Sequence, residues 1–251
     1  MMQMKKKLII SRRTALITGL SAAMGTILTN SCTKPLPPTY GNILRMGDVF
    51  TYEAQRALLD VKALAKEYNF SDISSFPATG SINPSDASLP GFNLDYELLH
   101  RNQFVNWKLP IEGCVARPGR YSMDDIKKFT SRTQITRHTC EEGWSAIAEW
   151  TGTPLGILLH HAGILPKARF VNFISYDNYN ISIDMFDAFH PQTILAYGMN
   201  GRNLPIQHGA PIRARIETQI GGQSVKYIKR IVVTDHFVDT GDNGWAWYMG
   251  I

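Results

Sequence analysis

The hydrophobic positions along this chain recur mostly at strand spacing. Short apolar runs, several alternating with polar residues, predict strands over residues 107–113, 133–139, 170–175, 179–183, 193–197 and 225–234. Helical spacing occurs over residues 154–162 and over residues 42–70, where Ala54, Leu58, Val61, Leu64 and Ala65 share one face. Many short strands with few short helices indicate a mixed α+β fold.

Turn and capping residues separate these elements. Ser122 and Asp125 have the spacing of a capping box, which predicts the start of a short helix. Asn200-Gly201 is typical of a tight hairpin turn. Residues 71–92 are rich in Ser, Pro, Asp and Asn, and we expect them to form a surface loop.

The net charge of +5 comes entirely from the first 31 residues. These residues hold five lysines and arginines and no acid, whereas the remainder carries 21 basic and 21 acidic residues. A neutral body lacks the excess of Lys and Arg that binding along a phosphate backbone requires. We therefore expect no nucleic-acid partner.

The same 31 residues have the pattern of an export signal. Arg12-Arg13 precedes a mild apolar run from Ala15 to Leu28. Adjacent arginines before a weakly hydrophobic stretch are typical of twin-arginine export, which carries folded proteins. A general secretory signal and a short membrane anchor are the alternatives, but about 14 apolar-leaning residues fall short of the roughly 20 that a span needs. We expect residues 1–31 to be a signal peptide and the protein to be periplasmic or otherwise extracytoplasmic.

Cys32 follows this run at the position where a bacterial lipoprotein carries its lipid, so it is a candidate for membrane attachment. The alternative is an unmodified cysteine beside the cleavage site. Three prolines between residues 35 and 38 are typical of a tether. We assign residues 32–92 to a linker with an N-terminal helical segment and residues 93–251 to a catalytic domain.

The segment around Cys140 concentrates cysteine, histidine, tryptophan and glycine at the end of a predicted strand. Beside Arg137 and His138, Cys140 is a candidate for a thiolate of lowered pKa, acting as a nucleophile or a soft metal ligand. Cys114 lies in an apolar run and is predicted to be a small buried hydrophobe rather than a disulfide partner. Zinc-binding and P-loop motifs are absent from the sequence.

These residues resemble the molybdopterin-binding domain of the sulfite oxidase family. The resemblance rests on R-x-x-C-x-E-G-W-S and W-x-G-x-P-L-x-x-L-L, and it continues in order through residues 195–201, 204–205, 208–213 and 224–230. The resemblance spans roughly residues 93–236. The sequence is similar also to periplasmic methionine-sulfoxide reductases. This resemblance implies a sulfite-oxidase-type α+β fold with mixed sheets and a Mo-molybdopterin cofactor.

The resemblance also implies roles for individual residues. Cys140 matches the cysteine whose thiolate binds molybdenum, a soft donor for that ion. The expected contacts with the pterin and its phosphate are Arg101, Asn102, Ser175, Asp177, His208, Arg213, Ser224, Val225 and Lys226. A competing register replaces Arg101 and Asn102 with Asn93, Tyr96 and Glu97.

Two more side chains are candidates for the chemistry itself. Tyr179 resembles the active-site tyrosine of sulfite oxidases and would orient substrate or share a proton; a half-buried strand tyrosine is the alternative. Arg137 would supply positive charge to an anionic oxygen at the metal, unless it forms a structural ion pair. His138 receives no role.

Together these observations predict an exported molybdenum oxidoreductase that transfers an oxygen atom, with two electrons, to or from a small oxo-substrate. Both S-oxide reduction and sulfite-type oxidation are open, although a dianion such as sulfite would favour several arginines and only Arg137 and Arg101 offer themselves. The sequence has no C-x-x-C-H haem motif, so we expect a separate electron-transfer partner, quinone-linked in the membrane or a cytochrome. The alternatives are a non-catalytic periplasmic binding domain that retained the fold and a Cys140–His138 hydrolase.

Overall fold

The computed structural model describes residues 50–51, 53–54, 56–58, 60 and 63–238. The chain divides into two compact units, Met1–Gly47 and Asp48–Ile251, and the first lies wholly outside the described residues. The predicted export signal, Cys32 and the proline-rich stretch therefore lie outside them too. No helix in the described part of the chain is long and apolar enough to cross a membrane.

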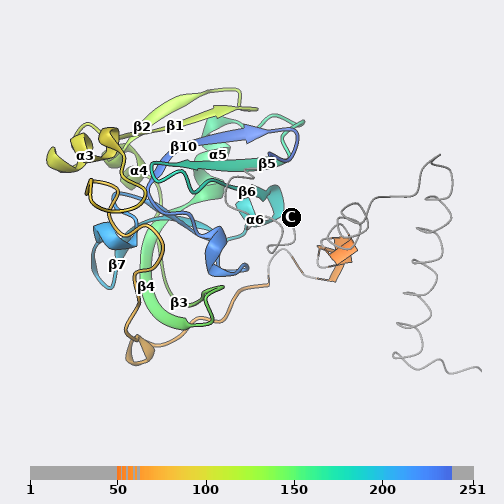
Figure 1. Cartoon of the computed structure of the whole chain (residues 1–251). Coiled ribbons are helices and arrows are strands. Elements are labelled where there is room, and N and C mark those ends of the chain that lie inside the picture. Colours follow the sequence, from red (N-terminus) through yellow and green to blue (C-terminus); the bar gives the residue numbers. More distant parts are fainter. Residues whose placement is uncertain (1–49, 52, 55, 59, 61–62, 239–251) are drawn as a thin grey trace, which may run out of the picture. The chain divides into compact units, whose positions relative to one another are not determined.

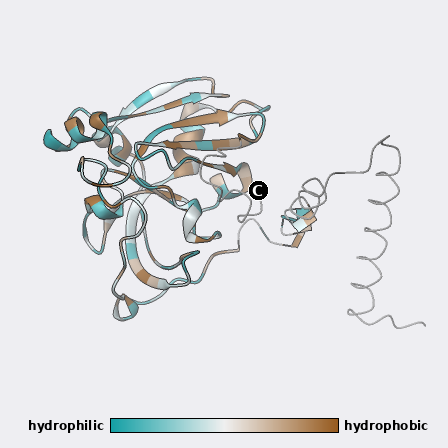
Figure 2. Ribbon diagram, viewed as in Figure 1, coloured by the Kyte–Doolittle hydropathy of each residue, from teal (hydrophilic) through white to brown (hydrophobic). Residues whose placement is uncertain are grey.

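The first of two five-stranded sheets runs in the order β2-β1-β10-β5-β6 (Figure 1). Its strands are β1 (Lys108–Gly113), β2 (Gly119–Ser122), β5 (Phe170–Ser175), β6 (Ile181–Asp184) and β10 (Ile228–Thr234). β1 and β10 pair in parallel and the other neighbours are antiparallel. Hydrophobic residues predominate on the inner strand β5, while the edge strand β2 is more polar (Figure 2).

The second sheet is built on a long curved hairpin. It contains β3 (Arg132–Thr139), β4 (Ser145–Pro154), β7 (Ile194–Met199) and β8 (Arg202–Asn203) in that order, and β9 (Arg213–Arg215) pairs with β7. Buried and more exposed residues alternate along β3, so that its even-numbered residues from Gln134 to His138 face the interior. The turn between β3 and β4 carries Cys140, and this turn positions the site described below (Figure 1).

Short helices connect and cover the sheets. They are α3 (Leu94–Arg101), α4 (Met123–Lys128), α5 (Leu155–Ala162) and α6 (Met185–Ala188), with 3-10 turns η1 (Phe70–Asp72), η2 (Ile206–His208) and η3 (Gly221–Gln223). The main hydrophobic core joins the buried face of α5 to the inner faces of β1, β5 and β10. Burial of these apolar side chains supplies most of the driving force for folding.

Several sequence predictions are confirmed. Ser122 and Asp125 form the complete capping box that opens α4, and Asn200 and Gly201 both adopt the positive φ of a tight hairpin turn between β7 and β8. Cys114 and Cys140 are both free and buried. β4 was not predicted from the sequence, because its polar residues and glycine interrupt the alternation of apolar and polar residues by which a strand is recognised.

The helical prediction over residues 42–70 is wrong for its second half. The described helical residues end at Leu58, whose side chain is 78% exposed, and residues 63–66 are not helical. Instead this segment lies along the second sheet: the Tyr68 backbone N–H donates to the Ile135 carbonyl, and Glu67 bridges to Thr136. Pairing with β3 therefore overrides the local helical preference.

Candidate cofactor site

A cavity of about 440 Å³ opens between the turn after β3 and the segment before β10. Pro90 and four stretches that are distant in sequence line it: residues 76–81, 138–144, 177–179 and 207–226. Among the predicted residues it brings together Cys140, Asp177, Tyr179, His208, Arg213, Ser224 and Lys226. This convergence of polar groups in one hollow is typical of a ligand site.

Cys140 is held at the cavity by a tight backbone turn. Its N–H donates to the Trp144 carbonyl at 2.9 Å, and its carbonyl accepts from the Gly143 N–H at 3.1 Å. Gly143 adopts a φ of 89°, which favours glycine. Burial raises the pKa of the Cys140 thiol, and the carboxylates of Glu141 and Glu142 raise it further. The lowered pKa expected from the neighbouring basic residues is therefore wrong for the protein alone, and a bound metal ion would have to displace the thiol proton.

Tyr179 presents a buried hydroxyl at the same cavity. Among the described residues this hydroxyl has no hydrogen-bond partner, and burial is the main cause that raises its pKa. Asp177 is held beside it, because the Ser175 hydroxyl donates to Asp177 Oδ1 at 2.6 Å and the Tyr179 N–H donates to the same oxygen at 3.2 Å. Ser175 thus orients Asp177 rather than lining the cavity.

The opposite part of the cavity is basic. Arg213 is buried, and its guanidinium donates to the carbonyls of His208 (3.1 Å) and Ser224 (2.7 Å). The Lys226 ammonium donates to the Thr79 carbonyl at 2.8 Å and also to the Ser81 carbonyl. Burial and the neighbouring cations lower the pKa of Arg213 to about 9, that of Lys226 to about 8 and that of His208 to about 4. A bound anion would relieve this repulsion.

Several lining residues escaped the sequence prediction, His138 and Phe76 among them. His138 lies on the buried face of β3, two residues before Cys140, a position that the alternation of the strand already implied. Phe76 belongs to the predicted surface loop, yet its ring packs within 5.2 to 5.6 Å of the rings of His138, Trp144, Trp150 and His208. No local pattern marks Phe76, because its contacts are all long-range.

Other predicted contacts lie away from this cavity. Arg137 is on the exposed face of β3, with its guanidinium 5.3 Å from the centre of the Tyr68 ring. Arg101 is 74% exposed at the end of α3 and pairs with Glu97, and Asn102 is the C-cap of that helix. Successive side chains of a strand point to opposite faces, so Arg137 points away from the cavity that Cys140 lines. The linear motif, in which the two residues are close, does not show this.

The competing register does not reach the cavity either. The Asn93 side chain caps α3 by accepting from the Tyr96 N–H at 3.1 Å, and the Tyr96 hydroxyl donates to the Ala210 carbonyl at 2.6 Å.

Val225 is buried beside the cavity residues, and its carbonyl accepts from the Ala214 N–H. Its neighbours Ser224 and Lys226 line the cavity.

Residues 98–240 match the family described as the oxidoreductase molybdopterin binding domain. The chain belongs to this family. The matched segment extends from the end of α3 beyond β10 and includes Cys140, Tyr179 and the basic residues of the cavity.

The relatives bear related names. A protein of Azospira oryzae named for a subunit of protein-methionine-sulfoxide reductase is 35% identical over 58% of this chain and 56% of its own length. The catalytic subunit of the protein-methionine-sulfoxide reductase of Ralstonia nicotianae is 33% identical over 51% of this chain and 44% of its own length. The chain therefore spans about half the length of the curated relatives it matches.

A solved structure confirms the fold. The sulfane dehydrogenase of Paracoccus pantotrophus superposes with a TM-score of 0.51 at 24% identity, over 53% of this chain and 39% of the other. Mixed sheets with few short helices are thus the fold of a molybdopterin-binding domain, as the sequence predicted.

The residues of the cavity fit this cofactor. The buried Tyr179 hydroxyl lacks a partner, and the basic side chains form the donor set that a phosphate needs. Gly221 and Gly222 would let the backbone come close to a bound ligand, because neither carries a side chain. A Cβ on Gly222 would lie 2.9 Å from Glu141 Oε1 and 3.1 Å from the Tyr179 hydroxyl. Cys140 lines the cavity with a thiol, and sulfur is a soft donor of the kind that would suit molybdenum.

Proposed function

We propose that this protein is an exported oxidoreductase that reduces an S-oxide by two-electron oxygen-atom transfer, at molybdenum ligated by Cys140. The observation that carries the proposal is the meeting of Cys140, Tyr179 and the basic residues in one cavity of a molybdopterin-binding domain. Relatives named as methionine-sulfoxide reductases favour the S-oxide. Reduction of an S-oxide consumes two electrons and two protons and releases a sulfide and water.

When bound, the cofactor supplies the redox chemistry at the metal. His208, Arg213, Ser224 and Lys226 would hold its pterin and phosphate by charge-assisted and backbone hydrogen bonds. Cys140 would ligate the metal as a thiolate. Tyr179 keeps its phenolic proton because burial raises its pKa, so its hydroxyl would donate to the substrate oxygen.

Charge around Cys140 favours a neutral substrate. Glu141 and Glu142 follow it directly, and both carboxylates line the cavity. Arg137 and Arg101, the two cations that would have attracted sulfite, lie elsewhere. A dianion beside Cys140 would meet two like charges, because Arg213 and Lys226, the cations of the cavity, are assigned to the phosphate of the cofactor, whereas an S-oxide carries no net charge. The arrangement therefore supports reduction of an S-oxide over oxidation of sulfite.

The electrons would come from a separate protein, because the curated relatives are themselves named as subunits. We propose a membrane quinone-linked protein or a cytochrome as this partner. Such redox encounters use small interfaces, under about 1,200 Å² in total.

Metal analysis and a substrate screen test the proposed function. We expect about one molybdenum and one pterin per chain after expression with sufficient cofactor, and reduction of free methionine sulfoxide by dithionite-reduced viologen dye. Sulfite with ferricyanide as oxidant provides the comparison, and we expect a lower rate with it. Protein that folds but contains no molybdenum would contradict the proposal and favour a binding domain that retained the fold.

Export is tested in the N-terminal segment. Replacement of both Arg12 and Arg13 by lysine should leave precursor in the cytoplasm, because the twin-arginine pathway distinguishes the arginine pair from lysine. Fractionation with antibody detection measures this. Lys34→Arg, which lies after the expected signal, is the control and should not change export. Normal accumulation of the double-lysine variant outside the cytoplasm would exclude the twin-arginine route.

Lipid attachment is tested separately. Labelled palmitate that enters the protein only when Cys32 is present would establish it.

A further inference from the structure

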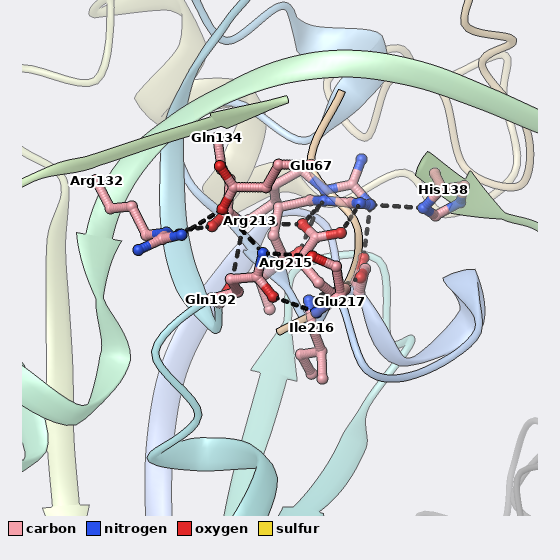
Figure 3. A network of polar contacts seen from close by, with 12 residues as sticks. Glu67, Arg132, Gln134, His138, Gln192, Arg213, Arg215, Ile216 and Glu217 are labelled. Atoms are coloured by element: carbon pink, nitrogen blue, oxygen red, sulfur yellow. Dashed lines mark hydrogen bonds and ion pairs between the residues drawn. The ribbon is translucent and has the colours of Figure 1, made fainter. Parts of the chain in front are cut away.

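A buried ion pair lies directly behind the cavity. The side chains of Arg215 and Glu217 are each 1% exposed, and the guanidinium donates to the carboxylate at 2.8 and 3.0 Å. The third contact of Arg215 is with His138: its Nη1 lies 2.6 Å from His138 Nδ1 (Figure 3). Glu217 thereby orients Arg215, and Arg215 orients the imidazole ring.

This contact determines which ring nitrogen of His138 carries the proton. A guanidinium has only donors and stays charged in proteins, so Nδ1 must be the acceptor. An accepting Nδ1 carries no hydrogen, and the neutral ring then holds its proton on Nε2. The Arg215–Glu217 pair thus selects the Nε2–H form of His138.

The Nε2–H of His138 has no hydrogen-bond partner among the described residues, and the ring lines the cavity. A Cβ on Gly221 would lie 2.3 Å from Nε2 and 2.5 Å from Cε1, so the Gly221 backbone packs directly against this part of the ring and only glycine fits there. The titratable groups that act on His138 are Arg215, Arg213, Lys226 and His208. His138 therefore lies on the basic part of the cavity, apart from Tyr179, on which Glu141, Asp177 and Cys140 act.

We infer that His138 is an additional cofactor-binding residue, which donates a hydrogen bond from Nε2 to the pterin cofactor, and that Arg215 and Glu217 are positioning residues that hold it in this form. A neutral donor suits the location. Arg213, Arg215 and Lys226 already place three cations around it, and another would add repulsion, whereas a neutral N–H adds direction to the binding without charge.

The positioning pair is itself anchored to the second sheet. The Gln134 amide donates to Glu217 Oε1 at 3.1 Å and to the Gln192 carbonyl at 2.9 Å. Gln192 in turn donates to Glu67 at 2.9 Å, and Glu67 pairs with Arg132 at the surface (Figure 3). A fully connected network of this kind restrains the orientation of its members.

The inference rests on the cofactor, and cofactor retention tests it without a turnover assay. We expect His138→Phe, which keeps an aromatic ring but no donor, to lose pterin about 3- to 10-fold faster than wild type, the effect of one hydrogen bond. His138→Gln should stay within about 2-fold of wild type, because its amide oxygen can accept from Arg215 while its nitrogen donates. Pterin that remains after gel filtration of the loaded protein is measured by fluorescence over time.

His161→Phe is the matched control, because His161 is exposed and packs on Tyr121 and Phe129, outside the cavity. We expect wild-type retention in this control. Equal retention by His138→Phe and wild type would overturn the inference. Molybdenum in the wild-type protein separates this result from failure of the cofactor assignment, in which no variant would contain the metal.

The tautomer is tested independently of any variant's stability. In loaded wild-type protein labelled with nitrogen-15 at histidine, His138 should show a protonated Nε2 and an unprotonated Nδ1, with its signals assigned from their loss in His138→Gln. In Arg215→Lys the Nδ1 signal should shift, because the guanidinium donor is gone. A proton on Nδ1 of wild-type His138 would refute the inference.

Discussion

Cys140→Ser is expected to abolish turnover while the pterin stays bound. Serine offers a hard, weakly acidic hydroxyl in place of the thiolate, so molybdenum would lose its proposed protein ligand. Loss of a residue that only holds a metal ligand in place typically lowers metal affinity or activity by about 10- to 100-fold, and we expect loss of the ligand itself to lower activity by at least about 100-fold. In the proposed site Arg213 and Lys226 would hold the pterin and its phosphate independently of Cys140, so pterin content should be retained. Viologen-linked turnover and pterin fluorescence measure the two effects.

Cys114→Ser is the matched control for this prediction. Cys114 is also free and buried, but it belongs to the hydrophobic core and does not line the cavity. This variant should keep wild-type turnover per bound molybdenum and lose only stability, because it buries a hydroxyl in place of a thiol. Wild-type turnover by Cys140→Ser would disprove the ligand assignment.

Arg215→Met is expected to lower the free energy of unfolding by about 3–5 kcal/mol, the cost of leaving one partner of a buried ion pair uncompensated. The Glu217 carboxylate would remain 1% exposed without its cation. The stacking of the Arg215 guanidinium, 4.5 Å from the centre of the Trp150 ring, would also be lost. Urea unfolding of cofactor-free protein measures the change without a contribution from ligand binding.

Two variants complete this experiment. Arg215→Met with Glu217→Leu should recover at least half of the loss, because no buried charge is then left alone. Arg132→Met removes an ion pair to Glu67 that is partly solvated, and we expect a change of at most about 1 kcal/mol. Equal effects of Arg132→Met and Arg215→Met would show that burial of the pair does not govern its contribution.

The elements with strong local signals could be predicted from the sequence. The capping box at Ser122 and the hairpin turn at Asn200-Gly201 depend on side chains and backbone angles within a few residues of each other. Family resemblance also identified Cys140, because its motif is contiguous along the chain. These features are local, so neighbouring residues suffice to specify them.

Only the tertiary structure determined which residues line the cavity. Strand alternation turns Arg137 to the exposed face of β3 and His138 to the cavity, and the packing of distant segments brings in Phe76. Burial reverses the expected direction of the pKa shift at Cys140. The tautomer of His138 depends on Arg215, 77 residues away in sequence. Desolvation and long-range hydrogen bonds exist only after the chain has folded, so no motif encodes them.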